Sequence, residues 1–181
     1  MIAAMLAVDE GGAIGNKGEL PWPRLSEDMK WFRETTKNSM VVMGRKTWDS
    51  LPSRPLPNRV SIVVSRSNEK PHGYDQSKVT FLGDNWKKWL MAIEKAQTRF
   101  ITESSPQFII GGAEIYRQAF DICDTIYLTT VYGKHEADTY MPNLGLVLSD
   151  FFLSETPHEY EKCKMEIWHR EKDDTGSGLS S

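Results

Sequence analysis

The 181-residue chain has the length of one domain, with enough interior for a core built around a sheet. Its 39% hydrophobic and 26% charged residues are typical of a soluble globular protein, and its net charge of −3 offers no basic field for nucleic acid. No apolar stretch approaches the ~20 residues that span a bilayer, so an embedded membrane protein is excluded as well.

In the first half of the chain, strand-like and helix-like segments alternate. Ile2 to Val8 is a nearly unbroken apolar run, which predicts a strand covered on both faces. Asp9 to Arg24 is rich in glycine and proline and predicts a long loop, which in a compact domain is more often functional than idle. Ser26 is the expected N-cap of a helix that runs to about Thr36. Further strands are expected over Ser39–Met43, Val60–Ser65 and Val79–Leu82, with a short helix that starts at Arg45.

The second half contains one clear amphipathic helix, capped by Asp84 or Asn85. Its apolar residues recur at helical spacing and predict a core face: Trp86, Trp89, Leu90 and Ile93. A strand over Phe108–Ile110, a helix from Ala113 to about Phe120 and a strand over Thr125–Tyr132 follow.

At the end of the chain, Cys163, Met165 and Ile167 alternate with Lys164, Glu166 and Trp168, which predicts a terminal strand with one wetter face. We expect one domain over 1–172 and a disordered or artificially added tail over 173–181. The alternation of elements predicts an α/β fold with a mostly parallel sheet, helices on both faces and an antiparallel strand at the end.

The scarcity of cysteines and the start of the chain indicate the compartment. Cys123 and Cys163 are far apart and fit a reducing cytosol better than a disulfide framework. The histidines stand apart, so no metal-ligand spacing occurs and no metal is expected. The first residues lack the basic flank and cleavage site of a secretory signal. We therefore expect a cytoplasmic protein.

Two strand–glycine–helix junctions are candidate anion sites, one at Gly44 and one at Gly111-Gly112. Glycine lets a ligand approach the backbone, and free N–H groups at a helix N-terminus favour a phosphate. Arg45 and Lys46 add positive charge to the first junction, and Ser65-Arg66 ends another strand. One junction is weak evidence because every α/β protein needs tight turns, but two together favour a nucleotide with separated phosphates.

Asp28 is the candidate functional acid. It shares a helix face with Phe32, and Met29 flanks both. The helix dipole would lower its pKa and apolar neighbours would raise it, and the sequence leaves the outcome open. Such a carboxylate suits a flat, nitrogen-rich heterocycle with two parallel N–H donors. The alternative is that Glu27 and Asp28 are ordinary acids at a helix start.

An ordered series of motifs ties these features together: Leu6-Ala7-Val8-Asp9, Ile14-Gly15, Leu20-Pro21-Trp22, Asp28 with Trp31-Phe32, Val42-Met43-Gly44-Arg45-Lys46-Thr47-Trp48, Arg54-Pro55-Leu56-Pro57-Asn58-Arg59, Ile110-Gly111-Gly112-Ala113-Glu114-Ile115-Tyr116 and Asp138-Thr139. Over roughly Met1 to Arg170 the chain resembles the dihydrofolate reductase family. The resemblance implies a single-domain mixed sheet of about eight strands with about four helices. It also implies reduction of 7,8-dihydrofolate with NADPH, binding of antifolate inhibitors, and a cytoplasmic monomer that binds neither nucleic acid nor membrane.

The resemblance also implies roles on the substrate side. Asp28 would bind the pterin N3 and 2-amino edge and assist protonation at N5, with Trp22 ordering water and Thr129 supporting the acid. Arg59 would pair with the glutamate α-carboxylate, a bidentate task that suits a guanidinium. The pocket would be lined by Met5, Met29, Phe32, Leu51, Leu56 and Ile110.

On the cofactor side, the implied nicotinamide contacts are Ala7, Ile14, Gly15 and Tyr116. The implied phosphate contacts are Gly44, Arg45, Lys46, Thr47, Ser65 and Arg66. Gly111-Gly112 would form a cis peptide bond, and Ala113, Glu114 and Ile115 would continue the cofactor-binding junction.

Three departures from the family pattern matter. The stretch from Trp22 to Asp28 is one residue longer than in common bacterial members, so Glu27 competes for the acid's role; Asp28 is favoured because Glu27 is rotated by about 100° around the helix. Glu114 stands where bacterial members often carry a basic residue, which argues against one 2′-phosphate contact. Met5 replaces a smaller or aliphatic residue and would alter the pocket.

Two competing functions remain at this stage. The reductase domain of riboflavin synthesis is similar in fold and in NADPH chemistry but acts on an open pyrimidine, and the Pro21-Trp22 loop, Asp28 and Arg59 argue against it. A catalytically silent pterin- or nucleotide-binding protein is the other, and retention of the acid and both junctions argues against that.

Overall fold

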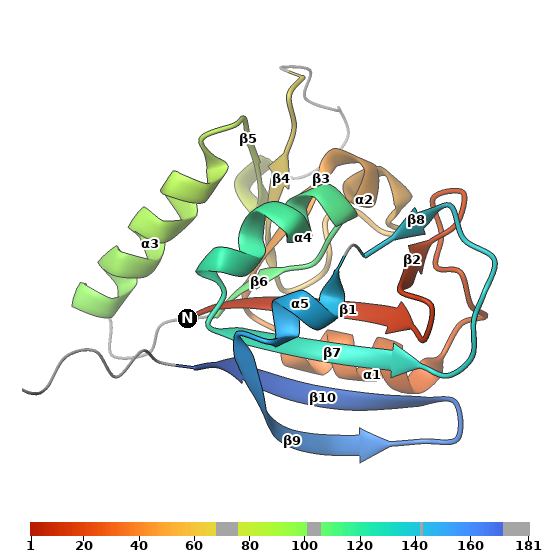
Figure 1. Ribbon diagram of the computed structural model, residues 1–181. Helices are drawn as coiled ribbons and strands as arrows, with labels where there is room; N and C mark the ends of the chain where they lie inside the picture. The colour runs from red at the N-terminus through yellow and green to blue at the C-terminus, as the bar shows by residue number, and fades with distance from the viewer. Residues whose placement is uncertain (68–75, 101–105, 142, 172–181) are drawn as a thin grey trace, which may run out of the picture.

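A computed structural model of the chain describes residues 1–67, 76–100, 106–141 and 143–171. Its centre is an eight-stranded sheet in the order β5-β4-β3-β6-β1-β7-β10-β9 (Figure 1). These strands are β1 (Ile2–Asp9), β3 (Met40–Gly44), β4 (Val60–Val64), β5 (Val79–Leu82), β6 (Gln107–Ile109), β7 (Thr125–Val131), β9 (Phe151–Glu159) and β10 (Cys163–Arg170). The strand expectations made for these regions are confirmed, except that β9 was not expected.

The sheet is mixed. From β5 to β7 all neighbouring strands are parallel, whereas β10 is antiparallel to both β7 and β9. The mostly parallel α/β sheet with a C-terminal antiparallel strand is therefore confirmed. The edge strand β9 has one buried residue at its start and exposed residues along the rest, including Pro157. Proline is tolerated there because an edge strand leaves its outer N–H groups unpaired.

Among the described residues, five α-helices accompany the sheet where about four were expected: α1 (Ser26–Thr35), α2 (Arg45–Ser50), α3 (Trp86–Phe100), α4 (Ala113–Ala119) and α5 (Leu144–Leu148). Two short 3₁₀ segments are η1 (Gln76–Lys78) and η2 (Phe120–Ile122). The five-residue α5 is too short to show a helical period in sequence. None of the described helices is long and apolar enough to cross a membrane.

Two hydrophobic cores lie on opposite faces of the sheet, because successive strand residues point to opposite sides. Along β1, Ile2, Ala4, Leu6 and Val8 belong to one core, whereas Ala3 and Met5 belong to the other. The first core also takes in the buried residues Trp86 and Leu90, which confirms the predicted core face of α3. Figure 1 shows α3, α4 and α5 on one side of the sheet and α1 on the other.

Three local expectations are wrong. Ser26 is not the N-cap of α1: it is the first helical residue, Leu25 occupies the cap position, and the Ser26 hydroxyl donates to Glu27 Oε2 at 2.9 Å. The predicted loop after β1 contains a short strand, β2 (Ala13–Gly15), which pairs with β8 (Thr139–Tyr140) in a second sheet.

The third wrong expectation concerns the wetter face of β10. Glu166 is buried there, and Lys164 Nζ donates to its carboxylate at 2.7 Å. This ion pair lets a carboxylate lie in a covered position. The expected tail over 173–181 lies outside the described residues.

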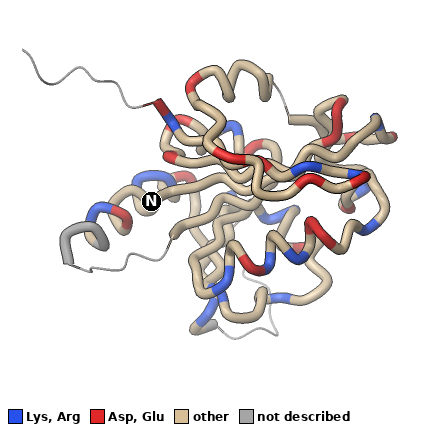
Figure 2. Tube along the Cα trace, turned by 90° about the horizontal axis from the view of Figure 1, so that it is seen from below, with Lys and Arg blue, Asp and Glu red and all other residues tan. Residues whose placement is uncertain are grey.

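Acidic and basic residues are interspersed along the described part of the chain, as Figure 2 shows. Several form ion pairs, including Arg45 with Asp49 at 2.9 Å and Lys87 with Asp121. The phosphate site that the sequence predicts therefore depends on local arrangement and not on a general excess of positive charge.

Candidate active site

Several of the sequence-predicted site residues lie at the carboxyl end of the parallel strands, whereas Arg59, which directly precedes β4, lies at the opposite end. β1, β6 and β3 are neighbours, and Asp9, the Gly111 junction and Gly44 follow or end these strands. In open α/β sheets, ligands bind beyond the carboxyl ends of the parallel strands. The fold thus brings both glycine junctions and the loop that carries Trp22 to the edge where a ligand is expected.

Asp28 lies in the first turn of α1 and is only 8% exposed, whereas its neighbour Glu27 is exposed. Thr129 Oγ1, on β7, donates a 2.7 Å hydrogen bond to Asp28 Oδ1. Burial raises the pKa of Asp28, and the bond from Thr129 lowers it by less. Desolvation therefore outweighs the effects that favour the anion, which resolves the question left open by the sequence.

Glu27 has the opposite environment. Its own backbone N–H and the Ser26 hydroxyl donate hydrogen bonds to it, and together they lower its pKa. A solvated carboxylate with a lowered pKa remains ionised and has no apolar wall beside it. The helix therefore presents Asp28, and not Glu27, to the protein interior, as its position four residues before Phe32 predicts.

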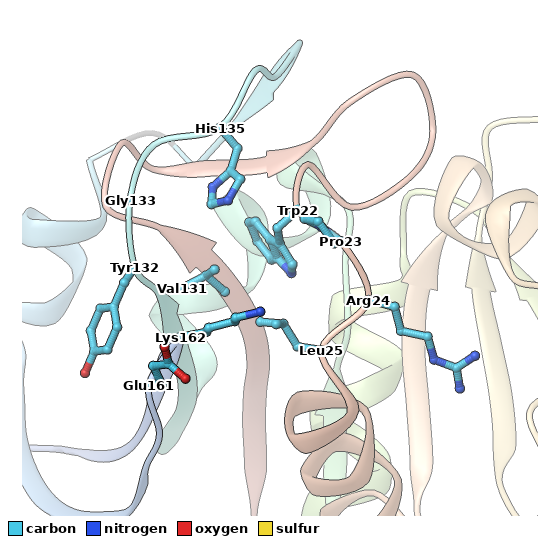
Figure 3. A pocket seen from close by; sticks show the side chains of 10 residues that line it. All are labelled: Trp22, Pro23, Arg24, Leu25, Val131, Tyr132, Gly133, His135, Glu161 and Lys162. Carbon is cyan, nitrogen blue, oxygen red and sulfur yellow. The ribbon is translucent and has the colours of Figure 1, made fainter.

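Trp22 is a buried member of the second core. It is 5% exposed, and its Nε1 has no hydrogen-bond partner among the described residues. A buried indole N–H normally has a partner, so this donor is suited to a water or ligand. Trp22 lines a pocket of about 470 Å³. His135, Leu25 and Lys162 also line this pocket (Figure 3).

The predicted pterin-pocket residues form an apolar surface that is neither solvent-exposed nor fully covered. Four of them are half-buried and pack against the second core: Phe32, Leu51, Leu56 and Ile110. Met29 is also half-buried, whereas Met5 is buried. Half-covered apolar side chains on one face of a sheet are suited to a flat ligand.

Arg59 is buried and is held by the C-terminal end of α1. Its Nε donates to Thr36 Oγ1 at 2.9 Å, and its Nη2 donates to the Arg33 carbonyl at 3.1 Å. The guanidinium also lies 5.6 Å from the Phe32 ring centroid. Burial and the positive charge of Arg33 lower the pKa of Arg59. These contacts fix the plane of the guanidinium, which a bidentate carboxylate site requires.

The two glycine junctions lie against each other. Gly44 N donates to Gly111 O at 2.7 Å, and the Gly111-Gly112 peptide bond is cis, as the resemblance implied. A side chain at Gly111 would lie 3.3 Å from Thr47 Oγ1, and its φ of +126° disfavours other residues. The N-caps of α2 and α4 are Gly44 and Gly112, so no cap side chain occupies the first-turn N–H groups.

Basic side chains surround these junctions, although some are already paired. Arg45 is bound to Asp49, while Lys46 and Arg66 are exposed. Glu114, at the start of α4, accepts hydrogen bonds from Arg117 at 2.6 and 2.7 Å. Those bonds, with smaller effects that include the charge of Arg66, lower the pKa of Glu114. Glu114 is thus an ionised acid near an expected phosphate contact.

The remaining cofactor-side residues differ in exposure. Half-buried residues are Ile14, Gly15, Ser65 and Ala113, whereas Ile115 and Tyr116 are buried. Ile115 packs in the first core, and Tyr116 donates its hydroxyl to the Met5 carbonyl at 2.8 Å. The side chains of Ile115 and Tyr116 point into the core, so a ligand at the junction would contact their backbone more readily than their side chains.

The sequence did not reveal two contacts between distant loops. Lys17 N donates to Asp138 Oδ2 at 2.8 Å, which joins the loop after β1 to the loop before β8. His135 N donates to Asp9 Oδ2 at 2.6 Å, across 126 residues of sequence. Asp138 was signalled by the motif Asp138-Thr139, but isolated His135 carried no signal.

Among the described residues, no cluster of three or more histidine, cysteine or carboxylate ligands could hold a metal.

These features define an α/β protein with a buried acid, a guanidinium fixed at the amino end of β4, and paired glycine junctions at the carboxyl edge of its sheet. A family profile described as Dihydrofolate reductase matches residues 1–169. The mouse dihydrofolate reductase is 32% identical over 185 residues, with 92% of this chain and 95% of that protein covered. The viral dihydrofolate reductase of Saimiriine herpesvirus 2 is 33% identical over 157 residues, with 81% of this chain and 70% of that protein covered.

A solved structure agrees with the sequence relatives. It is a dihydrofolate reductase from Enterococcus faecalis complexed with NADP(H) and RAB-propyl, with a TM-score of 0.73, 29% identity, and coverage of 95% of this chain and 97% of that one. The chain belongs to the dihydrofolate reductase family.

Proposed function

We propose that the protein reduces 7,8-dihydrofolate to 5,6,7,8-tetrahydrofolate with NADPH and so supplies one-carbon metabolism. The observation that carries this proposal is the buried Asp28, hydrogen-bonded to Thr129 at 2.7 Å. It is accompanied by half-buried apolar residues that pack against the second core. Burial raises the pKa of this carboxyl, and a raised pKa favours the protonated form that assists protonation of the reduced C=N bond.

On the substrate side, Asp28 holds the N3 and 2-amino edge of the pterin through paired N–H donors and promotes protonation at N5. The Trp22 Nε1 donor orders the water that delivers this proton. Thr129 orients the carboxylate by its donated hydrogen bond. Arg59, already fixed by α1, binds the glutamate α-carboxylate of the substrate.

The pterin and aminobenzoyl groups lie against the apolar surface described above. The residues assigned to this surface are Met5, Met29, Phe32, Leu51, Leu56 and Ile110.

The cofactor site fits NADPH because Gly111 and Gly112 leave the space beside Thr47 free of side chains: a Cβ at either position would lie 3.3 Å from Thr47 Oγ1. When bound, NADPH supplies a hydride from nicotinamide C4 to pterin C6. The glycine junctions and the basic side chains would hold its phosphates; these residues are Gly44, Arg45, Lys46, Thr47, Ser65, Arg66, Gly111 and Gly112. Ala113 and Glu114 continue the second junction, where the anion of Glu114 opposes a phosphate contact. Ala7, Ile14, Gly15, Ile115 and Tyr116 border the nicotinamide, so proximity and orientation of the two rings carry much of the rate.

We also propose that the protein binds antifolate inhibitors and acts as a cytoplasmic monomer whose domain spans residues 1–172. Two observations support the compartment: Cys123 and Cys163 are both free and buried, and neither is part of a disulfide framework. Inhibitor binding is supported by the half-buried apolar surface beside Asp28, which suits a flat diamino heterocycle.

The test is a spectrophotometric assay of NADPH loss with two alternative substrates. Dihydrofolate should be consumed with a kcat/KM in the ordinary enzyme range, above ~10⁴ M⁻¹s⁻¹. The open-ring aminopyrimidine of riboflavin synthesis should not be reduced. Turnover of the pyrimidine alone would assign the protein to that other reductase class. Binding of NADPH and dihydrofolate without turnover would make it a silent binding protein.

A further inference from the structure

His135 lies in the loop between β7 and β8, far along the chain from Asp9, the residue it contacts. Its backbone N donates to Asp9 Oδ2 at 2.6 Å, and its Nδ1 lies 3.2 Å from the same oxygen. The side chain is 24% exposed, whereas that of Asp9 is 1% exposed. The backbone and the ring of His135 are therefore fixed on one buried carboxylate.

The other oxygen of Asp9 holds the loop that leads toward Trp22. Asp9 Oδ1 accepts hydrogen bonds from Gly11 N at 2.8 Å and from Ala13 N at 2.9 Å. Burial alone would raise the pKa of Asp9, but the backbone donors of Ala13, His135 and Gly11 lower it. Asp9 is thus a permanent anion at neutral pH and joins the two loops through separate oxygens.

The imidazole of His135 packs edge-on against the Trp22 ring. Their centroids are 5.8 Å apart with an interplanar angle of 67°, and both side chains bound the same pocket in Figure 3. T-shaped aromatic pairs at this separation are energetically favourable and define the relative tilt of the rings. Trp22 Nε1 has no hydrogen-bond partner among the described residues, so packing against the His135 ring, and not a hydrogen bond, orients this donor.

We propose that His135 is a positioning residue: fixed on Asp9, its imidazole sets the tilt of the Trp22 ring and hence the direction of the Trp22 Nε1 donor. The effect on the reaction rests on the proposed function, in which that donor orders the proton-delivering water. His135 itself acts only through Trp22, because no contact places it on Asp28.

Two variants separate the ring from the Asp9 contact. His135→Asn keeps a side-chain donor for Asp9 but removes the ring. His135→Phe keeps a ring against Trp22 but loses the side-chain donor. Both retain the backbone bond to Asp9, and Lys134→Ala, at an exposed neighbouring position, is the matched control.

The first readout is the Trp22 indole ¹⁵N–¹H resonance of the ligand-free protein, assigned by its loss in Trp22→Phe. We expect His135→Asn to shift this resonance, because the ring current of the imidazole disappears, while Lys134→Ala leaves it unchanged. An unmoved resonance in a folded His135→Asn protein overturns the proposal. This readout does not depend on turnover, so it remains decisive if the proposed function fails.

The second readout is hydride transfer to dihydrofolate. His135→Asn should lower kcat roughly three- to tenfold with little change in KM for either ligand, the scale expected of one aromatic pair. His135→Phe should stay within about twofold of wild type on the same reasoning. The loss caused by His135→Asn should disappear when Trp22 is already phenylalanine, because interacting residues are not additive. Equal losses in the Asn and Phe variants, or additive losses with Trp22→Phe, would assign His135 a purely structural role.

Discussion

Asp28 carries an energetic cost in the folded chain. Burial raises its pKa above the ordinary value of 3.8, so the folded state binds the proton more tightly than the unfolded state does. As the pH rises between the unfolded and folded pKa values, the unfolded chain releases its proton first and gains in relative stability. Above both values, the buried anion therefore lowers the free energy of unfolding.

Replacing this carboxylate should consequently stabilise the protein. Asp28→Asn keeps an oxygen that can accept the Thr129 hydrogen bond but cannot ionise, so its free energy of unfolding should exceed that of wild type at pH 8. The difference should shrink as the pH falls toward 3.8, the ordinary aspartate value. Urea unfolding at several pH values measures it, with Glu27→Gln as a control that should show no such gain. A less stable Asp28→Asn protein at pH 8 would contradict the buried-anion interpretation.

At Arg59, the expected effect depends on the substrate. Arg59→Lys keeps the charge but loses the planar donors, so binding of dihydrofolate should weaken by roughly tenfold or more, the scale of one charge-assisted hydrogen bond. A dihydropterin without the glutamyl tail has no carboxylate to lose, so its KM should change little. Because Arg59 also bonds to Thr36 and Arg33, equal impairment of both substrates would mean that it shapes the fold instead of binding the tail.

At the scale of elements, variants in α3 measure how much the packing of one helix against the sheet contributes to the free energy of unfolding. Leu90 is fully buried in the first core, whereas Lys88 on the same helix is exposed. Leu90→Ala should lower the free energy of unfolding by about 2–5 kcal/mol, because a buried side chain is replaced by a cavity. Lys88→Ala should change it by less than ~0.5 kcal/mol. Similar values for both variants in chemical unfolding would contradict the packing of this helix.

Elements with a strong local pattern could be predicted, and those defined by distant pairing could not. β1 is an apolar run and α3 has an apolar face at helical spacing, so the local sequence of each predicts which of its residues are buried. β2 and β8 have three and two residues, and each exists because the other lies beside it. β9 is exposed at all positions but its first, so neither alternation nor an apolar run marks it.

The same division holds for the site. Asp28 could be chosen over Glu27 because their helix faces differ by a fixed rotation. The direction of its pKa shift could not be predicted, since that depends on how deeply the fold buries it. The contact between His135 and Asp9 joins residues 126 positions apart, and no local property of a single histidine signals it.

At the scale of the whole molecule, the charge distribution bears on cofactor choice. NADPH should exceed NADH in kcat/KM because Arg45, Lys46 and Arg66 lie near the junctions. Glu114 opposes this preference, because its anion interacts with Arg66.

Removing that anion is the direct test. Glu114→Gln should raise the NADPH-to-NADH ratio by about two- to fivefold, with a smaller effect at high salt because exposed charges are screened. Glu155→Gln, on the exposed edge strand at the other end of the sheet, is the control and should leave the ratio unchanged. An unchanged or lower ratio in Glu114→Gln would place this residue outside the phosphate environment.

The most direct measurement of Asp28's role is the single-turnover rate of hydride transfer from NADPH to dihydrofolate between pH 5 and pH 9. In wild type and in Glu27→Gln, the rate should fall as the pH rises through an apparent pKa above the ordinary value of 3.8, because the buried acid promotes the reaction in its protonated form. Asp28→Asn should be slower by roughly a hundredfold at neutral pH, the scale of a lost general acid. An Asp28→Asn enzyme close to wild type, beside a Glu27→Gln enzyme that is crippled, would contradict this assignment of the catalytic acid.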